Sequence, residues 1–241
     1  MCTVTLIPQG GNDFILTSNR DEAPNRKTIS PEFYEYNNVN LLYPKDKLAG
    51  GSWIGVSEKK RVLCVLNGGY KMHQRRDFYR LSRGVVLKDL LIADDIIEAI
   101  NAYDLNEIEP FTLVIVNWDT ALQFFELVWD GEQKHFQELP LAPKIWSSSS
   151  LYSDVMKKER LEWFQDFKAK KALDRTSIIQ FHKTAGTGNK EYGVIMHRSY
   201  VRTTSITQVS LSNAIVAMNF EDFQTDVESS KQFNFAVSIN E

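Results

Sequence analysis

The sequence predicts a protein of the α+β class, in which strands and helices occupy separate stretches of the chain. Strand-like segments come first, a helical stretch follows, and more strands precede a second helical stretch and the final strands. This block order differs from the regular alternation of strand and helix that builds a parallel sheet. The sequence shows no internal repeat, and its 241 residues fit one large domain or two small ones.

A β-hairpin is expected at the start of the chain. Residues 2–8 are rich in β-branched side chains, residues 10–13 (Gly-Gly-Asn-Asp) favour a turn, and residues 14–17 return as a strand. The charged run at residues 19–22 (Asn-Arg-Asp-Glu) precedes Ala-Pro, so we expect it to leave the strand as a loop. The hairpin would bring this charged run back beside the N-terminus.

The remaining elements follow from the period of the apolar residues. Apolar side chains recur at helical spacing in three stretches, and short apolar or alternating runs bounded by turn residues indicate strands. The Asp-Asp pair at 94–95 is a plausible cap between two helices of the first helical stretch. The expected helices span residues 78–104, 152–172 and 174–183, and the expected later strands span residues 33–36, 41–43, 61–66, 111–117, 121–128, 133–139, 192–197, 201–211, 214–220 and 233–239.

The composition excludes several classes of function. A net charge of −3 argues against a general nucleic-acid binder. The sequence has no apolar run of the ~18 residues that a membrane span needs, and no secretory signal is visible. Two cysteines in a chain of this length are not a disulfide scaffold, so a reducing cytoplasm is the simplest compartment. The four histidines show no clustered metal spacing, and we expect neither a metal nor a cofactor.

The second residue, Cys2, is the candidate nucleophile. Removal of Met1 would leave a thiol and a free α-amine on one residue. An α-amine titrates near ~7.7–8.0 and a thiol near ~8.5, so the amine can accept the thiol proton at neutral pH. A cysteine here could equally be a small buried hydrophobe at the start of a strand.

Two glycine turns are further candidates for the site. Gly50-Gly51 before Trp53 suggests a sharp bend where the backbone approaches another group closely. The apolar strand 61–66 ends at Asn67-Gly68-Gly69, a turn that can free backbone N–H groups and direct an Asn side chain into a site. Cys64 lies within that strand and is expected to be inert core.

These motifs together resemble one family. Met1-Cys2-Thr3, the tetrapeptide at 19–22, Ala-Gly-Gly-Ser-Trp-Ile-Gly at 49–55 and Leu-Asn-Gly-Gly at 66–69 stand in the order and near the spacing found in the NRDE family. Its eukaryotic members are called transport and Golgi organisation protein 2. The segment 200–205 is similar to the family's Gly-Thr-Arg stretch but lacks the leading Gly. At residues 147–151 the family often has Ser-Asn before Leu, and this chain has Ser instead of that Asn.

The NRDE family in turn is similar to the N-terminal-nucleophile hydrolases, in particular to penicillin V acylase and bile salt hydrolase. The resemblance implies a single domain, residues 1–241, folded as a four-layer αββα sandwich with mostly antiparallel sheets. It also implies roles for individual residues. Cys2 would attack an amide carbonyl, Asp21 would hold the α-amine, and Asn67 would help form the oxyanion hole. Arg20, or less directly Arg202, would supply a guanidinium near the thiolate. The substrate would be contacted by Asn19, Glu22, Trp53 and Arg202.

Two functions follow from the sequence. The first is an N-terminal-cysteine hydrolase or acyltransferase that acts on a linear, non-peptide C–N bond of a small N-acyl substrate. The alternative is a non-catalytic protein of the same fold that handles an apolar ligand such as a lipid or haem, as suggested by the many aromatic residues. The basic segment 70–76 could steer a carboxylate or phosphate toward the site or could be solvated surface. The sequence leaves the oligomeric state open.

Overall fold

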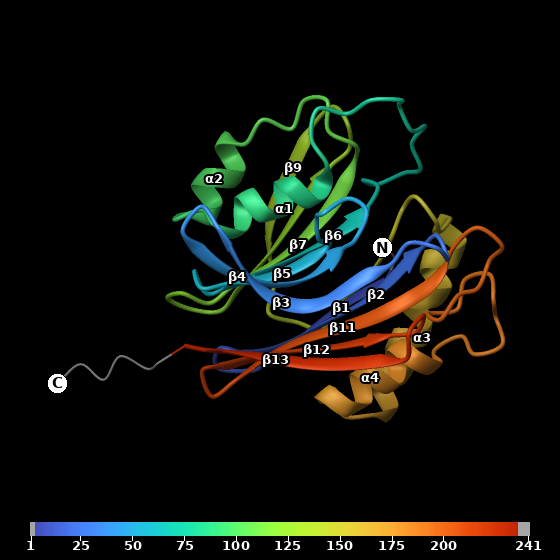
Figure 1. Ribbon diagram of the computed structural model, residues 1–241. Coiled ribbons are helices and arrows are strands. Elements are labelled where there is room, and N and C mark those ends of the chain that lie inside the picture. Colours follow the sequence, from blue (N-terminus) through green and yellow to red (C-terminus); the bar gives the residue numbers. More distant parts are fainter. Residues whose placement is uncertain (1–2, 236–241) are drawn as a thin grey trace.

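Two antiparallel β-sheets stacked face to face form the centre of the computed structural model, which describes residues 3–235 (Figure 1). Every strand pairing within the sheets is antiparallel. The first sheet has the spatial order β10 (Lys144–Ser147), β1 (Thr3–Gly10), β2 (Asp13–Glu22), β11 (Arg202–Ser212), β12 (Ile215–Asp222), β13 (Val227–Asn234). The second has the order β3 (Thr28–Tyr36), β4 (Val39–Asp46), β5 (Ile54–Ser57), β6 (Arg61–Asn67), β7 (Phe111–Asn117), β8 (Gln123–Trp129), β9 (Lys134–Leu139).

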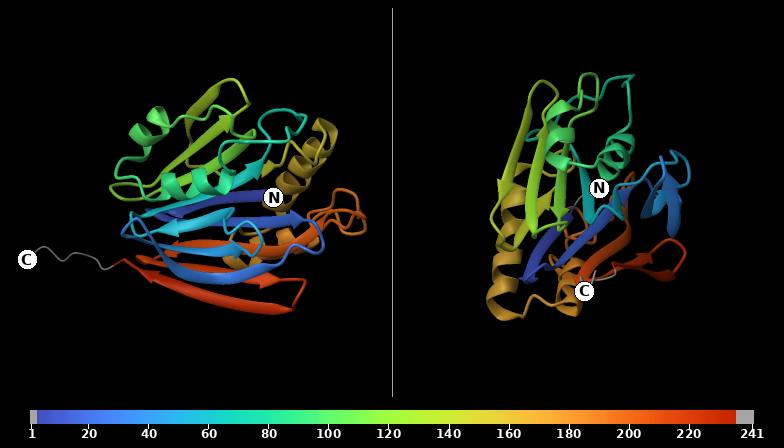
Figure 2. Two further views of the ribbon diagram at one scale, coloured as in Figure 1. Left: turned by 45° about the horizontal axis from the view of Figure 1, so that its top comes forward. Right: turned by 90° about the vertical axis from the view of Figure 1, so that its left-hand side faces the viewer.

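Helices cover the outer face of each sheet (Figure 2). The helices α1 (Arg83–Leu91) and α2 (Ile96–Ala102) lie over the second sheet, and α3 (Asp154–Lys170) and α4 (Arg175–Thr184) lie over the first. Each helix begins at a Ser or Asp whose side chain accepts a backbone N–H of the first turn, which satisfies one otherwise unpaired donor. The result is the expected α+β architecture of four layers.

Apolar side chains fill the spaces between the layers. The main core lies between the sheets and under α1, and Val4, Leu16 and Cys64 are fully buried there. A second core joins the outer face of the first sheet to α3 and α4, where Ile15 and Phe181 pack. Because strand side chains alternate between faces, β1 and β2 contribute to both cores.

The charged run at residues 19–22 lies in a strand, and the expected loop is wrong. β2 continues to Glu22 because it is paired on both sides: Thr3 of β1 lies opposite Asn19, and Arg202 of β11 lies opposite Glu22. Central strands satisfy their backbone groups with two neighbours, so polar side chains do not end them when those side chains also find partners. The expected hairpin that returns this run to the start of β1 is confirmed.

Several other boundaries differ from the sequence expectations. Residues 192–197 form turns, because Gly193 and the bridge from His197 to Arg202 close a tight loop instead of a strand. The last strand, β13, begins at Val227, and the expected strand at 233–239 extends beyond the described residues. Pairing with longer neighbours creates β5 and β10, which the sequence pattern does not indicate. None of the helices in residues 3–235 is long and apolar enough to cross a bilayer.

Candidate active site

The alternation of β2 divides the charged run between two faces of the first sheet. Arg20 and Glu22 face the second sheet and line a cavity of about 140 Å³. Asn19 and Asp21 face the helices α3 and α4, where both are buried. One tetrapeptide therefore supplies polar groups to both faces of the sheet, because the side chains of a strand alternate between its two faces.

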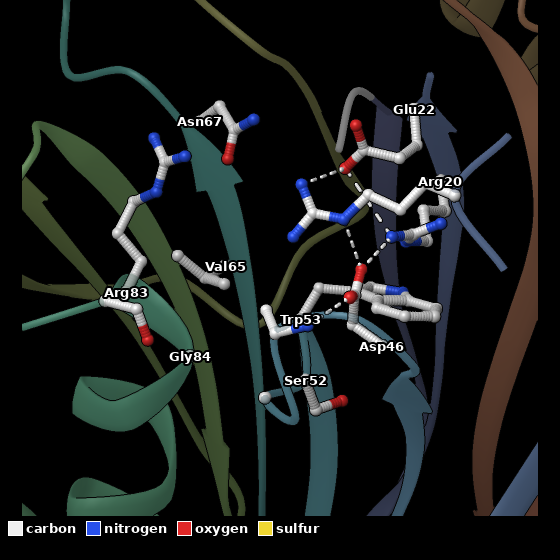
Figure 3. Close-up of a pocket in the computed structure, with 13 residues that line it drawn as sticks. Arg20, Glu22, Asp46, Ser52, Trp53, Val65, Asn67, Arg83 and Gly84 are labelled. Atoms are coloured by element: carbon white, nitrogen blue, oxygen red, sulfur yellow. Dashed lines mark hydrogen bonds and ion pairs between the residues drawn. The ribbon is translucent and has the colours of Figure 1, made fainter. Parts of the chain in front are cut away.

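The cavity lies where the two sheets meet the N-terminal end of α1 (Figure 3). Arg20 and Glu22 come from β2, Trp53 precedes β5, and Asn67 ends β6, so the fold brings together four of the residues singled out in the sequence. The glycine turn before Trp53 also lines the cavity, through Ala49, Gly51 and Ser52. The rest of the lining was not anticipated: Arg26, Asp46, Val65, Ser82, Arg83 and Gly84.

A buried ion-pair network fixes Arg20. Its Nη2 donates to Asp46 Oδ2 at 2.5 Å, and Arg26 Nε donates to the same oxygen at 2.7 Å. The Arg20 guanidinium also lies over the Trp53 ring, 4.6 Å from its centre. Burial alone would raise the pKa of Asp46, but hydrogen bonds from Ala49 N–H and Arg26 and the two guanidinium charges lower it below its ordinary value. Asp46 therefore stays ionised and holds both arginines.

The Asn67 turn is pressed against the serine-rich segment that follows β10. Ser148 Oγ donates to the Asn67 carbonyl at 2.6 Å. Gly68 has φ +88°, and a Cβ there would come within 3.0 Å of Ser150 N, so this position requires glycine. Within the described residues the Asn67 side-chain amide makes no hydrogen bond and borders the cavity. That amide is therefore available as a donor to a bound group.

Arg83 lines the opposite side of the cavity from Arg20 (Figure 3). Burial lowers the pKa of its guanidinium, and Glu109, whose Oε2 lies 3.1 Å from Nη2, opposes that shift. The nearby Arg75 lowers the pKa further. The cavity thus has guanidinium groups on two sides, each held by a carboxylate.

Asp21 is the centre of a second buried network on the other face of β2. Its Oδ1 accepts a hydrogen bond from Thr203 Oγ1 at 2.6 Å, and its Oδ2 accepts one from Tyr152 OH at 2.8 Å. Both donors come from segments more than a hundred residues away in the chain. The carboxylate is thereby held beside the start of β1.

Arg160 of α3 connects this network to the first described residue. Its side chain is completely buried, with Nη1 donating to Thr3 Oγ1 at 2.8 Å and Nη2 donating to the Gly193 carbonyl at 3.0 Å. Its guanidinium also stacks on the Tyr152 ring at 3.8 Å. An arginine on the buried face of α3, in line with Phe164, was the sequence signal for this role. Arg160 lies outside the motifs, which are concentrated in the first half of the chain.

Asn19 holds the helix layer against the sheet. Its Nδ2 donates to the backbone carbonyls of His182 and Val194 at 3.0 and 2.8 Å, and its Oδ1 accepts from His182 Nδ1. Thr5 Oγ1 then donates to His182 Nε2 at 2.8 Å, so the ring is neutral with its proton on Nδ1. Burial, reinforced by the charge of Arg160, lowers the His182 pKa to about 3.

This histidine predicts a loss of stability on acidification. The folded pKa lies below the ordinary value of 6.5, so the unfolded chain binds the extra proton first. Stability is complete above pH 6.5 and falls as the pH drops, by about 2 kcal/mol between pH 7.5 and pH 5. Urea denaturation at the two pH values measures it. In His182→Gln this component of the pH dependence should vanish, and an unchanged slope in that variant would contradict the assignment.

The remaining candidates lie elsewhere. Cys2 precedes the described residues. Arg202 borders a separate cavity of about 420 Å³ with Met196 and Phe223. Cys64 is fully buried in the main core, as expected, and burial raises its pKa to about 12 despite a hydrogen bond with Ser18. No group of three potential metal-ligating side chains occurs among residues 3–235.

Comparisons with known structures identify the fold. The Caenorhabditis elegans N-acylethanolamine-hydrolyzing acid amidase ortholog aligns with a TM-score of 0.58 at 14% identity, over 86% of this chain and 92% of that chain. Penicillin V acylase from Agrobacterium tumefaciens aligns with a TM-score of 0.56 at 11% identity, over 95% and 85% of the two chains. The expected N-terminal-nucleophile hydrolase architecture is thus confirmed.

Comparisons of sequence identify the family relationship. The profile of the family described as Transport and Golgi organisation 2 matches residues 1–180. That range contains all the motifs on which the resemblance was based except the segment at 200–205. No curated protein sequence matches the chain significantly.

Proposed function

Because the chain belongs to the Transport and Golgi organisation 2 family and has the fold of N-terminal-nucleophile amidases, we propose that it is an amidohydrolase or acyltransferase. Its substrate is a small N-acyl compound with a linear, non-peptide C–N bond. Cys2 is the nucleophile after removal of Met1. The solved relatives named above include an amidase and an acylase, which supports the reaction class.

One observation carries the proposal: the surroundings of Thr3. Thr3 is paired with Asn19 on one side and with Ser147 on the other. The next residues along those two neighbours are Arg20, which lines the cavity, and Ser148, which is bonded to Asn67. Cys2 precedes Thr3 in the sequence, and our proposal is that its thiol and amine react beside these residues. These residues supply a guanidinium and a free amide donor.

The reaction follows from these groups. The Cys2 α-amine takes the thiol proton, and the thiolate attacks the carbonyl carbon of the substrate amide. The Asn67 amide donates to the resulting oxyanion, a contribution of roughly 3–4 kcal/mol to lowering the barrier. The ammonium returns its proton to the departing nitrogen, which leaves a thioester on Cys2. Water or a second amine then attacks the thioester and releases the acyl product.

The Asp21 network would orient the base. Tyr152 and Thr203 each donate a hydrogen bond to the carboxylate and fix its orientation, so that it can hold the α-ammonium group in place. Its negative charge would favour the protonated amine after proton transfer. On the other face, Arg20 would favour the thiolate. The two faces of β2 would thus serve the two charges that form.

The alternative of an apolar ligand receives less support from the cavity. Its lining contains three arginines and two carboxylates, and its volume is about 140 Å³. Haem or a whole lipid needs a larger and more apolar site. The cavity suits the reacting amide of a substrate whose acyl chain extends outside.

The first test is the state and reactivity of the N-terminus. Intact mass of protein purified from its own host should show that Met1 has been removed. Iodoacetamide at neutral pH should label Cys2 rapidly, while Cys64, whose pKa is about 12, reacts only after unfolding. Retention of Met1 in that protein would refute the mechanism, since the amine would then be an amide with no basic lone pair.

A further inference from the structure

The segment between β6 and α1 projects beyond the four layers of the fold (Figures 1 and 2). We call residues 70–80 the basic loop. Its two ends are anchored beside the candidate site, because Asn67 just before it and Ser82 just after it both line the cavity. Whatever the basic loop contacts is therefore held near that cavity.

The basic loop exposes large apolar side chains. Tyr70, Met72 and Phe78 are 51%, 69% and 74% exposed. Exposed apolar side chains are common singly, but three on one protruding loop form a group that water solvates poorly. Such a group gains free energy when it enters an apolar phase.

The same loop has an excess of positive charge. Lys71, Arg75 and Arg76 make no ion pair within residues 3–235. Asp77 is the single acidic residue of the basic loop, while Arg80 is engaged by Asp104 at 3.2 Å. The chain as a whole carries −3, so this positive region is local.

We propose that the basic loop docks the protein on a membrane surface containing anionic lipids. Met72, Phe78 and Tyr70 would insert among the acyl chains, and Lys71, Arg75 and Arg76 would be attracted to the anionic head groups. Both interactions would hold the basic loop on the same membrane surface. A folded protein partner would need a complementary pocket for each apolar side chain, whereas a bilayer accepts them at any spacing. Docking would bring the cavity close to the interface, where amphiphilic N-acyl compounds concentrate.

Co-sedimentation of the full chain with lipid vesicles tests the proposal independently of catalysis. We expect binding to vesicles of phosphatidylcholine and phosphatidylglycerol, weak binding to pure phosphatidylcholine, and loss of binding as salt is raised. The pairs Met72→Ser with Phe78→Ser and Lys71→Glu with Arg76→Glu should each lower the partition coefficient about tenfold or more.

Matched controls come from α3. Val155→Ser with Leu161→Ser removes two exposed apolar side chains, which are 69% and 45% exposed, and Lys168→Glu with Lys170→Glu reverses two exposed charges. Both should bind as the wild type does. The proposal is overturned if the wild type fails to sediment with anionic vesicles at low salt, if it binds both vesicle types equally, or if the control pairs lose as much binding as the loop pairs. Activity toward a water-soluble amide would be unchanged in all four variants, so these results are distinct from a failure of the amidase proposal.

Discussion

Replacement of Cys2 by alanine is expected to lower kcat/KM for amide hydrolysis by at least about 10³-fold, the largest effect of any single substitution. The variant keeps the α-amine and the residues around Thr3 but has no nucleophile. The loss is measured by incubating each protein with a panel of N-acyl amides and monitoring the release of the free amine. Cys64→Ala should retain activity because its thiol is fully buried and, with a pKa of about 12, remains protonated.

A second variant separates the thiol from the amine. One extra residue that the host cannot remove, placed ahead of Cys2, would keep the thiol but convert the amine to an amide. Activity should be lost to a similar extent, whereas Cys2 should still be labelled by iodoacetamide, at a lower rate. Hydrolysis at the wild-type rate by Cys2→Ala would exclude Cys2 as the nucleophile, whereas a wild type that hydrolyses none of these amides would favour the ligand-binding role.

Replacement of Arg160 by methionine is expected to destabilise the fold by about 3 kcal/mol or more, the largest effect on stability. The substitution removes the donors to Thr3 Oγ1, to Ser147 Oγ and to the Tyr192 and Gly193 carbonyls, all near the start of β1. Buried acceptors left without donors each cost about 1–3 kcal/mol. Urea denaturation gives the free energy of unfolding.

The control for this substitution lies on the same helix. Lys158 is 77% exposed, with only a 4.0 Å ion pair to Glu162, so Lys158→Met should change stability by less than about 0.5 kcal/mol. Arg160→Lys should fall between the wild type and Arg160→Met, because an ammonium keeps the charge but cannot reach all the acceptors of a planar fork. Equal stability of the wild type and Arg160→Met would show that these hydrogen bonds contribute little net free energy.

Local patterns in the sequence were sufficient for most elements. The hairpin at the N-terminus and the apolar strand that ends at Asn67 were predicted because alternation and turn residues act over a few residues. The cap at Asp95 was predicted for the same reason. The strand character of residues 19–22 was missed, because it depends on pairing with β11, which lies some 180 residues away in the chain.

The candidate site shows the same division. Arg20, Glu22, Trp53 and Asn67 were singled out from motifs, and the fold brings them to one cavity. Asp46, Arg83 and Arg160 belong to none of these motifs, and their partners come from distant segments. Ion pairs such as Arg20 with Asp46 and hydrogen bonds such as Arg160 with Thr3 exist only after the sheets and helices have packed.

The sequence by itself determined the α+β class, the family and the residues around which a nucleophile could be built, since these depend on short motifs and on the period of apolar side chains. Only the tertiary structure decided which face of β2 each polar residue occupies. Because the side chains of successive strand residues point to opposite faces, Arg20 faces the cavity and its neighbour Asp21 faces the helices. That separation, which a loop would lack, is the physical reason that one tetrapeptide supplies a guanidinium to the cavity and a carboxylate to the network under the helices.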